Sequence, residues 1–286
     1  MRGSAPTSRV LDIVELLARA GEDRLRFSDV VRTLGLTQAT AHAILTTLCD
    51  RGWAARDPLD KSFGPGPALT ALAAAVQASR PLAAATRSAA ADLADELGYA
   101  ASVVERIGDH LVITAFISGS DDYERPARPG ERIPYAPPFG AAFAAWAPAA
   151  EQQAWIRRAG GDTAVAARLE QVLAHTRARG FDVDRTTPAL LQAAQLVGIL
   201  DEDGLPPHVR RIMDTLLAEF TSIGYLSDDD PERDSRSVFS ITAPVIDDHE
   251  TVAMIVGVHP MRVLNATQIA EVGRHVMRAA TTASTW

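Results

Sequence analysis

Histidines and aspartates close to the C-terminus are the first residues whose types could do chemistry. His249, His259 and His275 follow the neighbouring pair Asp247 and Asp248, and imidazole and carboxylate groups together can bind a metal ion. These residues fall on an expected turn, a strand end and a helix, and their spacing matches no zinc-ligand motif. We therefore predict neither a metal site nor a cofactor.

Nucleophile motifs are the second place where chemistry could reside. The sequence contains no G-x-S-x-G elbow and no glycine-rich phosphate loop. The single cysteine, Cys49, excludes an internal disulfide and a cysteine-rich zinc site. We expect it to fill space in a core, with redox sensing as the alternative. The protein is thus predicted not to be an enzyme, and a hydrolase that uses Ser240 or His259 is the competing hypothesis.

One short stretch has the pattern of a DNA-reading element. Residues 26–57, RFSDVVRTLGLTQATAHAILTTLCDRGWAARD, predict two short helices joined by a tight turn. The second helix places Gln38, His42 and Thr46 on the face opposite its apolar stripe, and no acidic residue precedes Asp50. Gln can pair with adenine in the major groove. The stretch therefore predicts a helix-turn-helix that reads double-stranded DNA.

Cationic side chains flank this helix and would supply the attraction for phosphate. Residues 1–80 hold ten Arg and Lys against eight Asp and Glu, a balance of +2, whereas the whole chain carries −8. Phosphate contacts provide most of the sequence-independent affinity for DNA, so this first part is the one expected to bind it. The predicted DNA contacts are Arg9, Arg32, Thr37, Gln38, Thr40, His42, Thr46, Arg51, Arg56 and Lys61.

Length and composition favour two globular domains. The chain has 286 residues, of which 47% are hydrophobic and 22% charged, and this fits a small and a medium-sized domain. Apolar runs such as Leu69–Val76 are too short to cross a bilayer, and the N-terminus lacks the apolar core of a secretory signal. We expect a cytoplasmic protein that does not bind membranes.

Hydrophobic periodicity and turn residues divide the chain into elements. The first part predicts helices capped by Ser8, Ser28 and Thr37, strands 53–56 and 61–63 that form a wing, and a helix within 67–80. The second part predicts a helix over 81–97, a hairpin over 101–117, a strand at 132–135, helices near 139, 149–158, 163–179, 188–200 and 207–223, strands at 237–246 and 251–260, and a helix over 266–280. Strands flanked by helices, with an antiparallel pair at each end, predict an α+β fold.

The order of these motifs resembles the IclR family of bacterial transcriptional regulators. GLTQATAHAILTTLCDRGWAARD is similar to the family pattern G-L-x-x-S-T-x-x-R-L-L-x-T-L-x-x-x-G-[YW], with matches at Gly35, Leu36, Thr40, Leu45, Thr47, Leu48, Gly52 and Trp53. The resemblance implies a winged helix-turn-helix (1–66), a linker helix (67–80) and a GAF-like α/β effector-binding and oligomerisation domain (81–286) with a helical insertion over 187–237. It also implies a sequence-specific regulator that is a homodimer or tetramer.

Departures from the family pattern affect both regions. Ala39 and Ala43 stand where the family commonly has Ser and Arg, which removes two phosphate or base contacts. In IPYAPPFGAAF the spacing from Pro to Gly is one residue shorter than in the family's P-L-H-x-T-A-x-G-K-A segment, and Ala141 stands in place of Lys. Ser240 replaces a common Cys. A sensor or protein-interaction module that has lost DNA binding is therefore the alternative to a DNA-binding regulator.

A pocket for a small organic effector is expected in the second domain. The predicted lining, taken from alternating strand faces, the following segment and the family's Cys position, is Val104, Arg106, Thr114, Phe116, Tyr135, Pro138, Phe139 and Ser240. Arg106 would pair with a carboxylate, so an aromatic or short-chain acid is the expected effector. Two alternatives stay open: these side chains pack an ordinary core, or the domain serves only for assembly.

Overall fold

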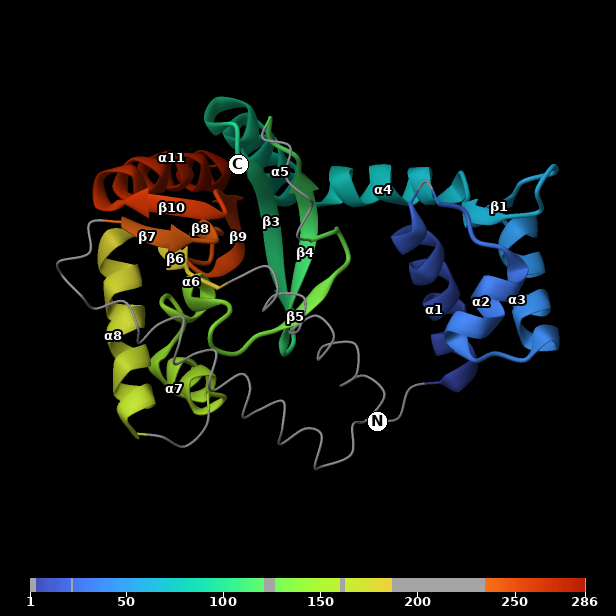
Figure 1. The fold of residues 1–286 in the computed structure, drawn as a ribbon, viewed down its shortest axis with the longest axis horizontal. Coiled ribbons are helices and arrows are strands. Elements are labelled where there is room, and N and C mark those ends of the chain that lie inside the picture. The colour runs from blue at the N-terminus through green and yellow to red at the C-terminus, as the bar shows by residue number, and fades with distance from the viewer. Residues whose placement is uncertain (1–3, 22, 121–126, 160–162, 187–234, 286) are drawn as a thin grey trace. The chain divides into compact units, whose positions relative to one another are not determined.

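A computed structural model of the protein describes residues 4–21, 23–120, 127–159, 163–186 and 235–285. The chain divides into two compact units, residues 1–80 and 81–286, each with its own hydrophobic core. In Figure 1 the first unit consists of helices and one short strand pair, and the second unit is a sheet with helices on both faces. The predicted helices 188–200 and 207–223, and most of the predicted insertion, lie outside the described residues.

The first unit is a helical domain with a two-stranded wing. Its elements are α1 (Ala5–Ala20), α2 (Phe27–Leu34), α3 (Gln38–Asp50), β1 (Ala54–Arg56), β2 (Phe63–Pro65) and α4 (Ala68–Ser79). Ile13, Leu17, Val30 and Leu45 meet in the core because apolar residues recur at helical spacing. Gly35 ends α2 with φ 60°, a left-handed conformation that glycine adopts at little cost, and this makes the tight turn before α3.

The first two helices begin earlier than the sequence predicted. α1 starts at Ala5 rather than after Ser8, with a proline in its first turn, where a missing N–H costs nothing. The predicted Ser28 cap of α2 is wrong, because the backbone N–H of Arg26 donates to the Asp29 carboxylate at 3.2 Å and the helix begins one residue after Arg26.

The wing strands are shifted from their predicted positions. β1 and β2 pair antiparallel, with Arg56 opposite Phe63. Lys61, expected at the start of the second strand, instead has a φ of 63° and belongs to the turn. Leu25 forms an additional bridge with Phe63, which ties the segment before α2 to the wing.

The second unit is built on a six-stranded antiparallel sheet in the order β5-β4-β3-β9-β8-β6. The strands are β3 (Ala100–Ile107), β4 (His110–Ile117), β5 (Arg132–Pro134), β6 (Asp182–Asp184), β8 (Ser240–Ile246) and β9 (Val252–His259). Two hairpins, β3–β4 and β8–β9, join along β3 and β9, where Ser102 lies opposite Gly257. The predicted α+β class with an N-terminal helix-turn-helix is confirmed.

Helices cover both faces of this sheet (Figure 1). α5 (Pro81–Leu97) and α11 (Ala266–Ser284) pack on the face that carries Val103 and Val256. α6 (Ala141–Ala144), α7 (Ala149–Arg157) and α8 (Thr163–Arg179) pack on the face that carries Val104 and Ile255. Neighbouring strand residues enter different cores because side chains alternate between faces.

The predicted strand 237–246 is interrupted. The backbone N–H of Phe239 donates to the Asp184 carbonyl at 2.8 Å, and β8 begins at the next residue. The preceding strand β7 (Ser235–Val238) pairs instead with β10 (Arg262–Asn265) in a separate two-stranded sheet. Neither β6 nor β10 was predicted, because each is too short for a clear alternation.

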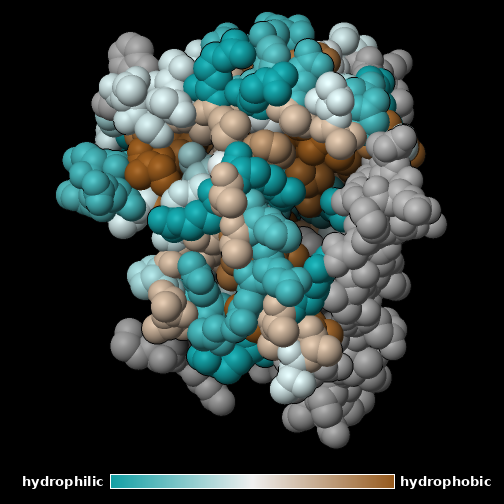
Figure 2. Space-filling view, turned by 90° about the vertical axis from the view of Figure 1, so that its left-hand side faces the viewer, coloured by the Kyte–Doolittle hydropathy of each residue, from teal (hydrophilic) through white to brown (hydrophobic). Residues whose placement is uncertain are grey.

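Apolar surface does not dominate the side of the second unit that carries α8 (Figure 2). No helix in the described part of the chain is long and apolar enough to span a bilayer. Figure 2 views the side that carries α8, where hydrophobic surface occurs only in separate patches among hydrophilic side chains. The exposed residues of α8 include Glu170, Gln171 and His175, which accounts for the hydrophilic character of this helix.

Candidate nucleic-acid interface and ligand site

α3 presents the polar face that the sequence predicted. The Thr37 hydroxyl accepts the backbone N–H of Thr40 at 3.2 Å and caps the helix. Gln38, His42 and Thr46 are exposed, while the apolar stripe of the helix packs in the core of the first unit. The predicted reading residues therefore lie along one exposed face.

An open hollow of about 410 Å³ lies between this face and the wing. The buried or half-buried side chains that form its floor are Phe27, Leu45, Cys49 and Phe63, and the exposed ones on its rim are His42, Thr46, Asp50 and Arg56. The Phe27 ring meets His42 edge-on with 6.4 Å between centroids, and the Arg56 guanidinium lies 5.4 Å from the Phe63 ring centroid. The structure thus brings His42, Thr46 and Arg56 together.

Burial raises the pKa of the Cys49 thiol, Asp50 raises it further, and Arg56 acts against both. The thiol therefore stays protonated and behaves as a small apolar group in the floor of the hollow.

Two residues of this hollow were missed from the sequence. Asp50 lies two turns after His42 and one turn after Thr46, so the 3.6-residue period already placed it on the reading face. Phe27 belongs to α2, and its approach to α3 depends on tertiary packing.

The predicted phosphate contacts are spread over the first unit. Arg9 lies on α1, Arg32 on α2 and Arg51 directly after α3, and all three are exposed. Arg32 forms an ion pair with Asp29 at 2.7 Å, and its side chain is 76% exposed. The Lys61 ammonium donates to the Pro58 carbonyl within the wing turn.

Two cations beside the wing were absent from the predicted set. Arg24 lies 3.9 Å from the Asp57 carboxylate, and Arg26 lies near Asp60. Hydrogen bonds from Ser62 lower the pKa of the Asp60 carboxyl, and the two arginines add to this effect. The acidic wing turn is therefore partly neutralised by neighbouring cations.

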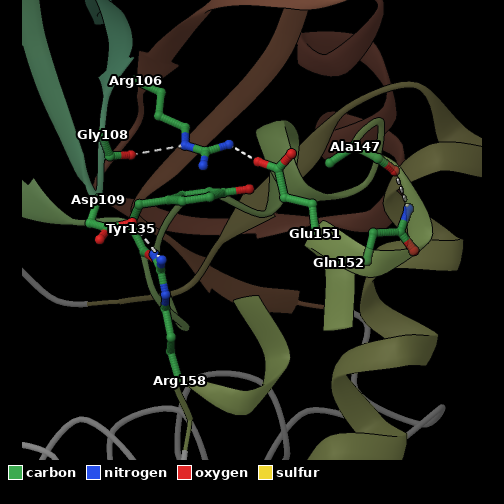
Figure 3. Close-up of polar contacts among 8 residues, drawn as sticks. All are labelled: Arg106, Gly108, Asp109, Tyr135, Ala147, Glu151, Gln152 and Arg158. Carbon is green, nitrogen blue, oxygen red and sulfur yellow. Dashed lines mark hydrogen bonds and ion pairs between the residues drawn. The ribbon is translucent and has the colours of Figure 1, made fainter. Parts of the chain in front are cut away.

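In the second unit, Arg106 lies over the ring of Tyr135 (Figure 3). Its guanidinium is 4.2 Å from the ring centroid, its Nε donates to the Gly108 carbonyl at 3.1 Å, and its Nη1 pairs with Glu151. The carboxylate partner expected from a ligand is thus supplied by the protein itself.

Tyr135 is held from its other side by Arg158 (Figure 3). The Arg158 guanidinium donates to the Tyr135 carbonyl at 2.6 Å and to Asp109 at 2.5 Å. Burial raises the pKa of the Tyr135 hydroxyl, although Arg106 and Arg158 act to lower it. These contacts join the turn of the β3–β4 hairpin to α7 and the residue that follows it.

A second polar group lies buried near the other end of β3. His259 Nε2 and the Ser102 hydroxyl are 2.8 Å apart, and both side chains are buried. The rings of Phe116 and Phe239 lie 5.3 and 5.6 Å from the imidazole. Nδ1 of His259 has no hydrogen-bond partner among the described residues. Burial lowers the pKa of His259 to about 4, so the ring is neutral at neutral pH.

The predicted pocket residues divide between these two places. Val104, Tyr135, Pro138 and Phe139 are buried on the side of Arg106, and Phe116 contacts His259. Ser240 is buried directly after Phe239. Ser102 and Arg106 are four positions apart on an extended strand, which separates their backbones by about 13 Å. A short acid could not contact both.

The expected alternation fails at Thr114. Val103 pairs with Ala115 and Val104 with Ile113, so Thr114 is the extra residue of a β-bulge. Its hydroxyl donates to the Val103 carbonyl at 3.4 Å. Simple alternation therefore does not establish that Thr114 shares a face with Phe116.

The histidines near the C-terminus do not gather into a cluster with the neighbouring aspartates in the part of the chain that the structure describes. Within the described ranges, no group of three or more His, Cys, Asp or Glu side chains has a metal-binding arrangement. His249 pairs at 3.6 Å with Asp248 in an exposed turn, whereas His259 is buried in the sheet. The histidines noted in the sequence thus lie in different surroundings.

A family model and a curated protein both relate this chain to one family of regulators. The family model for the IclR helix-turn-helix domain matches residues 6–58. The chain is 30% identical over 181 residues to the glycerol operon regulatory protein of Streptomyces griseus, covering 62% of this chain and 71% of that protein.

Solved structures show the same fold. The IclR transcriptional regulator of Alicyclobacillus acidocaldarius matches with a TM-score of 0.66 and 16% identity, covering 100% of this chain and 99% of that one. An IclR homologue from Microbacterium hydrocarbonoxydans, solved in complex with 4-hydroxybenzoate, matches with a TM-score of 0.63 and 16% identity over 98% of both chains. From its helix-turn-helix, its identity with a curated regulator and its fold, the chain belongs to the IclR family of transcriptional regulators.

Proposed function

We propose that the protein is a homodimeric regulator that reads a DNA operator with α3 and responds to a small organic acid in its second unit. The DNA-reading part of this proposal rests on the exposed face of α3, which carries Gln38, His42 and Thr46. No acidic residue occurs in α3 before Asp50, its last residue. An α-helix with such a face fits the major groove, and the wing lies next to it.

Base and phosphate contacts have different residues in this proposal. Gln38, His42 and Thr46 contact base edges, and the capping pair Thr37 and Thr40 approaches the backbone at the start of the helix. The phosphate contacts come from cations on the surrounding elements: Arg9, Arg32, Arg51, Arg56 and Lys61, to which Arg24 and Arg26 are added. In this division α3 selects the DNA sequence although its reading face carries no cation, because the surrounding cations supply the attraction for phosphate.

Dimerisation is supported by exposed apolar residues of the first unit. None of the residues of α4 is buried, although Leu72 and Val76 are large and apolar, with exposed fractions of 43% and 49%. Leu11 of α1 is 55% exposed. Covering these side chains with a second copy would bury apolar area and double the positive charge available to DNA. Size-exclusion chromatography with light scattering tests this, because Leu72→Glu with Val76→Glu should give a monomer.

The effector proposal rests on His259 rather than on Arg106. Buried polar atoms in proteins nearly always have a hydrogen-bond partner, so the orphaned Nδ1 supports a ligand that supplies one. The Tyr135 hydroxyl beside Arg106 also lacks a partner among the described residues, but there the cation already pairs with Glu151. The rings of Phe116 and Phe239 favour an aromatic ligand, and the Ser102 hydroxyl adds a second polar contact. An aromatic acid bound by a structural relative, 4-hydroxybenzoate, supports the same class of ligand.

Ser102 and His259 also invite comparison with a nucleophile and its base. Nδ1 has no carboxylate to orient it among the described residues, and a pKa of about 4 makes the imidazole a weak base. Nothing in the arrangement favours Ser240 as a nucleophile. We therefore propose ligand binding without turnover.

Operator selection from random DNA with the full-length protein tests the reading function. We expect one preferred sequence, with half-sites related by the symmetry of the dimer. A folded dimer without sequence preference at low salt would favour the alternative, a module that has lost DNA binding.

A thermal-shift screen of aromatic and short-chain acids tests the effector function. A ligand at one hundred times its Kd stabilises the protein by about 2.7 kcal/mol. His259→Ala should abolish this shift, while Arg106→Ala should retain it. A thermal shift that is lost only in Arg106→Ala would place the ligand beside Arg106, at the turn of the β3–β4 hairpin. No shift with any acid would favour a domain that serves only for assembly.

A further inference from the structure

The hollow beside α3 lies where a DNA-reading surface would meet the operator. Its rim contains His42 and Thr46 of the reading face, and its far side is the wing. It is therefore continuous with the proposed interface, on which the following inference rests.

The floor of the hollow is apolar. Leu45 and Phe63 are almost fully buried, so the accessible part of the floor belongs to the half-buried Phe27 and Cys49. An aromatic ring and a protonated thiol offer no strong hydrogen bond. A purely polar base edge placed over this floor would lose its contacts with water without replacement.

The charges on the rim do not draw a phosphate into the hollow itself. Asp50 contributes one carboxylate and Arg56 one guanidinium, so these two groups have no net charge. The carboxylate can accept a hydrogen bond from the amino group of cytosine or adenine, which only a base edge supplies. The hollow consequently matches base edges better than the sugar-phosphate strand.

Only one apolar group projects from the base pairs into the major groove, the C5-methyl group of thymine. We infer that the hollow receives a thymine methyl group in each half-site, with Phe27 as the residue that shapes the floor and orients His42. The edge contact of 6.4 Å between these rings limits the positions open to the imidazole. Phe27 thereby contributes to specificity without contacting a hydrogen-bonding group of a base.

Replacement of thymine by deoxyuridine tests the inference, because deoxyuridine removes the methyl group and keeps base pairing. Full-length protein is titrated with its selected operator and with variants that carry deoxyuridine at one thymine position at a time. We expect about a fourfold loss of affinity at one thymine of each half-site, which corresponds to about 0.8 kcal/mol for one buried carbon group. Other thymines should change affinity less than about 1.5-fold.

Protein variants identify the hollow as the site of this effect. In Phe27→Leu the same deoxyuridine substitution should lower the operator affinity less than about twofold, because the thymine methyl group and the Phe27 ring interact directly. Cys49→Ser, which replaces the thiol in the floor with a slightly smaller and more polar hydroxyl, should also reduce the effect. This variant tests the inference if Phe27→Leu does not fold. Leu16→Val, a change at a half-buried residue of the same core away from the hollow, serves as the matched control and should keep the fourfold effect.

Two results would overturn the inference. One is a selected operator in which no deoxyuridine substitution lowers the affinity by more than about 1.5-fold. The other is a methyl effect of unchanged size in both Phe27→Leu and Cys49→Ser. Either result leaves sequence-specific binding intact, whereas a protein that selects no operator at all contradicts the proposed function itself.

Discussion

The two units place their polar side chains in opposite ways. In the first unit, Gln38, His42 and Thr46 stand in solvent on a helix whose other face fills the core. In the second unit, Ser102 and His259 are buried beside aromatic rings. An exposed surface can exchange water for DNA, whereas a buried polar atom without a partner costs free energy. The contrast fits the proposed DNA surface in the first unit and the proposed small-ligand site in the second.

Matched core substitutions are expected to have the largest effect on this comparison. Leu45 of α3 and Leu93 of α5 are 1% and 2% exposed, and replacing either with Ala should cost about 2–5 kcal/mol. Hydrogen exchange should show lost protection in residues 1–80 for Leu45→Ala and in residues 81–286 for Leu93→Ala. Equal loss in both units from either substitution would contradict the assignment of separate cores.

The pH dependence of stability tests the buried half of the comparison. The pKa of His259 is lowered to about 4 in the folded protein, against about 6.5 when unfolded. The unfolded chain therefore takes up a proton that the folded chain rejects, and stability falls as pH drops below about 6.5. From about pH 7 to about pH 5 the loss from this residue should be about 2 kcal/mol.

Urea unfolding of the wild type and of His259→Gln measures this loss as a difference at each pH. Asp184 acts in the opposite direction, because burial raises its pKa to about 7 and its contribution is lost as pH rises through that range. The variant retains Asp184, so subtraction removes it. A constant difference between the two proteins from about pH 7 to about pH 5 would show that His259 is not held neutral by burial.

The smallest expected effect belongs to the ion pair of Arg106 and Glu151. Their side chains are 31% and 35% exposed, so solvent screens the pair. A double-mutant cycle with Arg106→Ala and Glu151→Ala should give a coupling of about 0.5 kcal/mol. The stack on Tyr135 survives Glu151→Ala, which makes that variant the control for the cation–π contact. A coupling above about 2 kcal/mol would mean that the pair is effectively desolvated.

Local patterns explain why the reading helix was predictable. The Thr37 cap and the 3.6-residue spacing fix both the start of α3 and its exposed face within one segment of sequence. Asp50 obeys the same spacing and was available to this argument. Phe27 was not, because its contact with His42 depends on how α2 packs against α3.

The second unit was less predictable because its site depends on pairing between distant strands. The β-bulge at Thr114 changes which residues share a face, and strand alternation alone does not reveal it. Ser102 and His259 are separated by 157 positions in the chain and meet only through the pairing of β3 with β9. Arg106 was assigned to a ligand on its charge, but tertiary packing supplies Glu151 as its partner.

The most direct test of the central claim compares two classes of variant on the selected operator. Gln38→Ala and His42→Ala should each lose about 1–3 kcal/mol of discrimination at particular base pairs, with the salt dependence unchanged. Arg51→Ala and Lys61→Ala should weaken binding to all sequences alike and lower the slope of log affinity against log salt by about 1. Binding measured over a salt series, on the operator and its single-base variants, distinguishes these outcomes. Equal losses on every sequence for all four variants would contradict the assignment of α3 as the base-reading element.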